Sequence, residues 1–227
     1  MDPALASLIA ACTTFVGSHF VLSHPLRAPL IRFTGEKGFP ALYSLVAFAS
    51  FGWVVMAFRA VPAGTPLWNG MADAPWIAAT LVMLVASVLL VGSFKGNPAM
   101  PAPGAADLAA KGPHGVFHST RHPMMWAFAL WSLAHVLVSP TPAVLVLAGA
   151  MAVLALLGSH FQDRKKEAAM GEAWKSWESQ TNFAPRLGRL AWAGAGPWIG
   201  GIILWLAATW AHGWLISMPA GLWRWLG

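Results

Sequence analysis

Four histidines in an apolar chain are the residues best placed to do chemistry. The chain has eight histidines but is only 10% charged. His19 and His135 lie well inside apolar segments, and His122 and His160 lie where such segments begin and end. An imidazole inside hydrocarbon needs a hydrogen-bond partner, a metal ion or a water-filled cavity. Imidazole is also an axial ligand of haem iron, so the pattern predicts a haem or metal site.

Simpler interpretations remain open for some of these groups. Interfacial histidines can satisfy lipid headgroups and backbone ends, which is the favoured interpretation for His24 and His212. Zinc is less suitable than haem, because no three ligands share a clear helical spacing. The single cysteine, Cys12, excludes an internal disulfide framework and a cysteine-only structural metal site.

The run Thr-Arg-His-Pro at 120–123 is a second candidate site. Proline at the first helical position leaves the first N–H groups of a helix unpaired, and such an end attracts anions. With Arg121 beside it, this end could hold a phosphate, a carboxylate or a haem propionate; alternatively, Arg121 is an interfacial anchor. Further along, Asp163 follows His160 by three residues and could orient an imidazole.

Membrane-spanning helices must position these groups. The chain is 57% hydrophobic with a mean hydropathy of +0.60, and its 227 residues leave no room for a separate soluble domain. We therefore predict one all-α integral membrane domain, 1–227, whose partner is the lipid bilayer. A net charge of +6 would suggest nucleic acid in a soluble protein, but topology explains it here, so no nucleic-acid partner is expected.

Apolar runs of about 20 residues predict about six transmembrane helices. The predicted spans are 3–24, 38–58, 75–94, 122–139, 142–161 and 198–218, and a Ser-Pro-Thr-Pro run at 139–142 separates the fourth from the fifth. The loops 25–37, 95–121 and 162–196 carry twelve of the 14 Lys and Arg residues, which places these loops in the cytoplasm and both termini outside. Residues 163–180 are predicted to form a surface helix that continues from the fifth span.

The runs at 15–19, 35–46, 120–135 and 160–174 resemble the NnrU-like membrane family, which is related to plant and cyanobacterial zeta-carotene isomerase. The resemblance covers about the first 185 residues and implies a bacterial inner-membrane protein associated with denitrification and nitric oxide metabolism. The isomerase relative uses haem b, and its axial ligands fall by motif on His19 and His135. Ser132 stands where that relative has a cysteine, and a hydroxyl is a poor substitute for a soft thiolate.

Helix geometry leaves the pairing of the ligands open. His135 lies thirteen residues beyond His122, about 20 Å along a helix, whereas His19 is expected about 10 Å from the cytoplasmic end. Two axial ligands must meet at one depth, so His122 or His160 is the alternative partner of His19.

Three functions follow from these patterns. The first is a haem b protein, an isomerase or redox-accessory enzyme whose apolar substrate arrives from the bilayer. The second is an S-adenosylmethionine-dependent methyltransferase using Arg121, His122 and the surface helix, because the Arg-His-Pro helix is also similar to membrane methyltransferases acting on isoprenylcysteine. The third is a non-enzymatic assembly factor for respiratory complexes.

Overall fold

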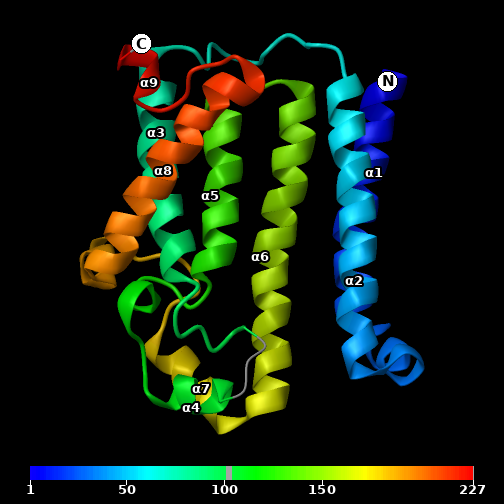
Figure 1. Cartoon of the computed structure of the whole chain (residues 1–227), viewed down its shortest axis with the longest axis vertical. Coiled ribbons are helices and arrows are strands. Elements are labelled where there is room, and N and C mark those ends of the chain that lie inside the picture. The colour runs from blue at the N-terminus through cyan, green and yellow to red at the C-terminus, as the bar shows by residue number, and fades with distance from the viewer. Residues whose placement is uncertain (101–103, 227) are drawn as a thin grey trace.

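A computed structural model describes residues 1–100 and 104–226, and this part of the chain is all-helical (Figure 1). In chain order the elements are α1 (Pro3–Ser23), α2 (Arg27–Ala60), α3 (Asp73–Gly92), α4 (Ala105–Ala110), η1 (Gly115–His118), α5 (Pro123–Val138), α6 (Pro142–Met170), α7 (Glu172–Gln180), η2 (Leu187–Ala193), α8 (Ala195–Ile216) and α9 (Trp223–Leu226), where η marks a 3-10 helix.

Five of these helices, α1, α2, α3, α6 and α8, are long and apolar enough to cross a membrane. The apolar helix α5 has 16 residues and packs between α3 and α6. The prediction of a multi-pass bundle of about six spans is therefore confirmed at the level of helix number and composition.

The long helices follow one another in space. Helix α2 packs on α1, and the series continues through α6, α5 and α3 to α8. Both termini lie at one end of the bundle, as an even number of spans requires, whereas α4 and α7 lie at the other (Figure 1). We call these the terminal end and the basic end, because the predicted cytoplasmic loops with most of the Lys and Arg residues lie at the latter.

Glycine and proline set where several helices start and stop. Proline occupies the first turn of α1, α5 and α6, where its missing N–H costs no hydrogen bond. Helix α6 extends beyond the predicted span to Met170, and α7 starts after Gly171, which has φ 55°. The predicted surface helix is thus divided between the end of α6 and α7. Residues of the predicted loop 25–37 are mostly helical, because α2 begins at Arg27 and has a kink at Gly35 (φ 75°).

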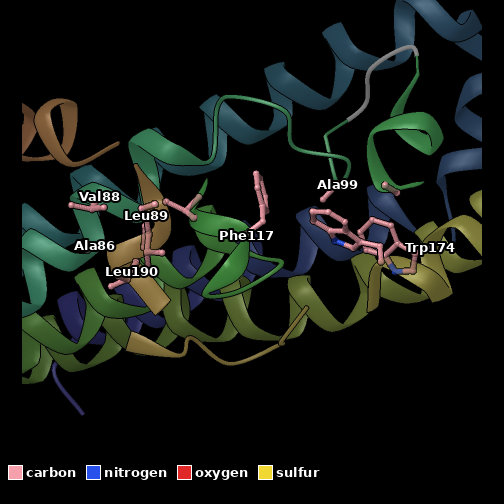
Figure 2. Packing of buried hydrophobic residues seen from close by; sticks show 12 residues of the cluster. Ala86, Val88, Leu89, Ala99, Phe117, Trp174 and Leu190 are labelled. Carbon is pink, nitrogen blue, oxygen red and sulfur yellow. The ribbon is translucent and has the colours of Figure 1, made fainter. Parts of the chain in front are cut away.

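An aromatic core closes the basic end (Figure 2). The side chains of Trp174 and Trp177 on α7 are fully buried, and the Phe117 ring lies 5.5 Å from that of Trp177. In the same region η1 packs against η2, and α4 packs against α7. This packing buries η1 and the non-helical residues that follow it, Ser119 and Thr120, before α5 begins.

The segment before α5 is tied to residues 182–186 by backbone hydrogen bonds. The Arg121 N–H donates to the Asn182 carbonyl (2.9 Å), and the Arg186 N–H donates to the Ser119 carbonyl (3.0 Å). The Phe183 carbonyl accepts from the Trp126 indole N–H at 2.8 Å. These bonds fix the start of α5 and the position of the two residues that precede it, Arg121 and His122.

Helices α3 and α8 approach closely at Gly201, and this contact predicts an asymmetric response to alanine. A Cβ at Gly201 would lie 2.7 Å from the Val88 Cα, whereas one at Gly213 on the same helix meets nothing within 4 Å. We expect Gly201→Ala to destabilise the protein by about 1–3 kcal/mol. Gly213→Ala should be neutral or stabilising, because alanine is the better helix former. Thermal unfolding of each variant in detergent, monitored by dye labelling of the buried Cys12 thiol, measures both effects. Equal unfolding midpoints for the two variants would contradict the close contact at Gly201.

Candidate functional site

A buried charged cluster connects α5, α6 and α7 at the basic end. The Arg121 guanidinium donates to both Asp163 oxygens, with a shortest distance of 2.7 Å, and lies 3.4 Å from Glu178 Oε1. The His122 Nε2 lies 2.8 Å from Asp163 Oδ1. The carboxylate of Asp163 therefore has a basic side chain on each of its two oxygens.

The second nitrogen of His122 faces an amide oxygen. Its Nδ1 lies 3.2 Å from Gln162 Oε1. The Gln162 amide nitrogen donates to the Ala99 carbonyl (3.2 Å), which orients the amide oxygen toward the imidazole. Both ring nitrogens of His122 thus lie within 3.2 Å of a side-chain oxygen, one from Gln162 and one from Asp163.

The ring of Phe183 covers this cluster. Its centroid lies 5.5 Å from the Arg121 Cζ and 5.4 Å from the His122 ring. The His122 side chain is fully buried and that of Asp163 is 9% exposed. Charges held away from water in this way need their partners, so the cluster locks α6 and α7 onto the start of α5.

A cavity of about 640 Å³ lies next to the cluster, among α1, α2, α5 and α6. It is lined by apolar residues with a few polar and basic ones: Phe15, His19, Phe20, Ser23, His24, Arg27, Tyr43, Ala99, Ala105, Met125, Phe128, Met151, Leu154, Ala155, Gly158, Gln162, Lys165, Lys166, Ala169 and Met170. Gln162 belongs to both the cavity wall and the cluster.

The lining changes character along α6. Met151, Leu154, Ala155 and Gly158 line its inner part, and Gln162, Lys165 and Lys166 follow toward the basic end. These residues recur at intervals of three and four, so they share one face of the helix. The cavity wall is thus mainly apolar inside the bundle, and its basic residues lie toward the end from which α6 leaves it.

His19 brings a free imidazole nitrogen to this cavity. Its Nδ1 lies 2.7 Å from the Phe15 carbonyl. A carbonyl can only accept, so the Nδ1 N–H donates this bond, and in the neutral ring Nε2 has a lone pair for a metal ion. Among the residues that the structure describes, Nε2 has no hydrogen-bond partner. The ring is held by Phe15 (centroids 4.4 Å apart) and Tyr43 (5.5 Å). This combination of a fixed ring and a backbone-bound N–H is typical of metal-ligating histidines.

The other predicted ligands lie elsewhere. His135 lies in the last turn of α5, near the terminal end, where its Nδ1 donates to the Trp131 carbonyl (2.8 Å) and its ring lies 6.3 Å from that of His212. His160 is exposed. Neither lines the cavity with His19. Within residues 1–100 and 104–226, no group of three or more His, Cys, Asp or Glu side chains could hold a metal ion.

At the start of α5, where the sequence predicts an anion site, the anionic group beside Arg121 and His122 is the carboxylate of Asp163. Asp163, expected to orient an imidazole, lies against that of His122, because the start of α5 lies beside that turn of α6. Arg121 is bonded to that same carboxylate. Ser132 is buried and donates to the Phe128 carbonyl (3.0 Å), so its hydroxyl satisfies the backbone.

Several cavity residues have no counterpart among the predicted site residues. In the sequence Lys165, Lys166 and Arg27 indicate only topology, and no pattern marks Gln162 or Tyr43 as site residues. The spacing of apolar and then basic residues on one face of α6 is a signal that could have identified the two lysines.

Comparison with known proteins identifies one family. A family model described as "NnrU protein" matches residues 7–220. No curated protein and no solved structure matches the chain.

The charged cluster predicts a large effect of removing its central carboxylate. Asp163→Asn leaves the Arg121 guanidinium buried without its nearest counter-charge, and we expect a loss of about 3–5 kcal/mol in unfolding free energy. Glu178→Gln removes only the more exposed partner, 3.4 Å from Arg121, and should cost about 0–1 kcal/mol.

The same thiol-labelling measurement at Cys12 separates these variants. Combining Asp163→Asn with Arg121→Gln should recover part of the loss, because the double variant buries one uncompensated charge fewer. Strictly additive losses, or equal losses for Asp163→Asn and Glu178→Gln, would show that the cluster is not the link between α5 and α6.

Proposed function

The chain belongs to the NnrU protein family, and we propose that it binds haem b in the cavity between the α1–α2 pair and α5–α6, where His19 Nε2 would hold the iron. The proposal rests on the fixed His19 ring, whose Nδ1 is held by the Phe15 carbonyl while Nε2 is free beside an apolar cavity.

The residues around His19 fit such a cofactor. The cavity volume of about 640 Å³ lies within the range of roughly 300–1,000 Å³ found for small-molecule and cofactor sites. Its inner wall is aromatic and aliphatic, with Phe15, Phe128 and Met151 among the contributors, which suits the apolar face of a porphyrin. The basic residues at one end supply partners for the two porphyrin carboxylates.

When bound, the haem would supply an iron centre able to act as a Lewis acid or to exchange electrons. The chain's part is to hold it and to control access. His19, held by its hydrogen bond to the Phe15 carbonyl, would fix the orientation of the haem. The apolar wall would keep water away from it. Because spanning helices surround the cavity, an apolar substrate would reach it from the bilayer, as an isomerase or redox-accessory enzyme requires. A role in nitrogen-oxide metabolism, implied by the family resemblance, stays a prediction.

The two alternatives have less support. A methyltransferase site would need the side chains of Arg121 and His122 to contact the cosubstrate. In this structure they contact Asp163 and Gln162 of the chain itself. A non-enzymatic assembly factor would use the same haem without turnover, so haem binding alone does not separate it from an enzyme.

Haem titration of the purified protein tests the proposal. Wild-type protein should develop an intense Soret band, and His19→Ala should bind haem at least tenfold more weakly and lose the spectrum of a histidine-ligated iron. Added imidazole should restore that spectrum, because it can replace the missing ligand in the space that alanine leaves.

Two single variants serve as controls for that titration. His160→Ala removes an exposed histidine and should behave as wild type. His135→Ala removes the second ligand expected from the resemblance, and it should also retain the band because His135 does not line the cavity. An unchanged spectrum in His19→Ala, or its loss in His135→Ala, would refute the assignment.

A further inference from the structure

Three cations gather at the basic end of the cavity. Arg27 comes from the first turn of α2, and Lys165 and Lys166 come from α6; all three line the cavity. Lys165 lies within electrostatic reach of Arg27, and Lys166 within reach of Lys165. The chain thus places like charges together beside a largely apolar space.

No carboxylate compensates these charges in the described part of the chain. The ion pairs formed there use Asp163, Glu178, Glu172 and Asp73, and none includes Arg27, Lys165 or Lys166. Lys166 Nζ donates to the Pro98 carbonyl at 3.0 Å and the Met100 carbonyl at 3.2 Å. These neutral partners fix its position and leave its charge available. A bound anion would relieve the mutual repulsion and form charge-assisted hydrogen bonds.

The distance from this basic group to the inner cavity fits an amphipathic molecule. His19 and His24 line the same wall five residues apart, about 8 Å along α1, and Arg27 lies just beyond the turn. A ligand with its anionic edge at the three cations would therefore extend its apolar body past His24 to His19 and the aromatic wall.

We propose that the cavity selects amphipathic anions, whose carboxylate or phosphate groups bind Arg27, Lys165 and Lys166 while their apolar part fills the inner cavity. This inference rests on the proposed function in naming a porphyrin dicarboxylate as the ligand. An anionic lipid of the same leaflet has the same chemistry and is the second source of such a ligand. In either case the anionic end faces the basic end of the bundle.

Metal-free protoporphyrin IX and its dimethyl ester provide the test, because they differ only in the two carboxylates. Protein in nanodiscs of neutral phosphatidylcholine should bind the free acid at least tenfold more tightly than the diester, as measured by tryptophan quenching. The triple variant Arg27→Gln, Lys165→Gln, Lys166→Gln should bind both compounds with similar affinity.

A matched triple variant controls for net charge. Arg32→Gln, Lys37→Gln and Arg164→Gln removes three exposed cations from the same two helices, outside the cavity lining. It should keep the preference for the free acid. Equal binding of acid and diester by wild-type protein, or equal loss of preference in the two triple variants, would overturn the proposal.

Competition with oleate identifies the source of the anion. Displacement of the porphyrin by oleate but not by methyl oleate supports a lipid-like ligand, and failure of oleate to compete supports the porphyrin dicarboxylate. Because the metal-free compound has no iron, this result is independent of His19 ligation. If wild-type protein developed no Soret band with haem but still preferred protoporphyrin IX to its diester, the proposal of a haem protein would be rejected. The anion site at the basic end would stand.

Discussion

The carboxylate of Asp163, held between Arg121 and His122, is the interaction on which the basic end depends. It joins the start of α5 to α6, and Glu178 extends the link to α7. Charges with so little access to water are stable only with their partners in place. The cluster therefore fixes the relative position of α5 and α6, and these helices form one side of the cavity.

Gln162 connects that structural role to the cavity. The residue accepts from His122 on one side and lines the cavity on the other. Beyond it, α6 presents Lys165 and Lys166, and before it the same face is apolar. Helix α6 thus carries Asp163, the counter-charge of the buried cluster. The same helix carries the face on which apolar residues are followed by Lys165 and Lys166, which gives the cavity its preference for amphipathic anions.

The sequence predicts the bundle well because apolar runs of spanning length are a local property. It predicts element ends less well, since glycine permits but does not require the positive-φ conformations found at the kink at Gly35 and the break at Gly171. Pairing of His19 with His135 could not be settled from motifs, because the depth of His135 depends on where α5 begins. The partner of Asp163 also depends on tertiary structure, because the imidazole that it contacts, that of His122, comes from the start of another helix.

A structure of the haem-reconstituted protein in a lipid nanodisc would show directly whether His19 holds a cofactor in the cavity. We expect a porphyrin between α1 and α6, with its iron bound to His19 Nε2. The porphyrin carboxylates should lie toward Lys165 and Lys166. Iron bound at His135 near the terminal end, or a porphyrin outside the cavity, would contradict this assignment.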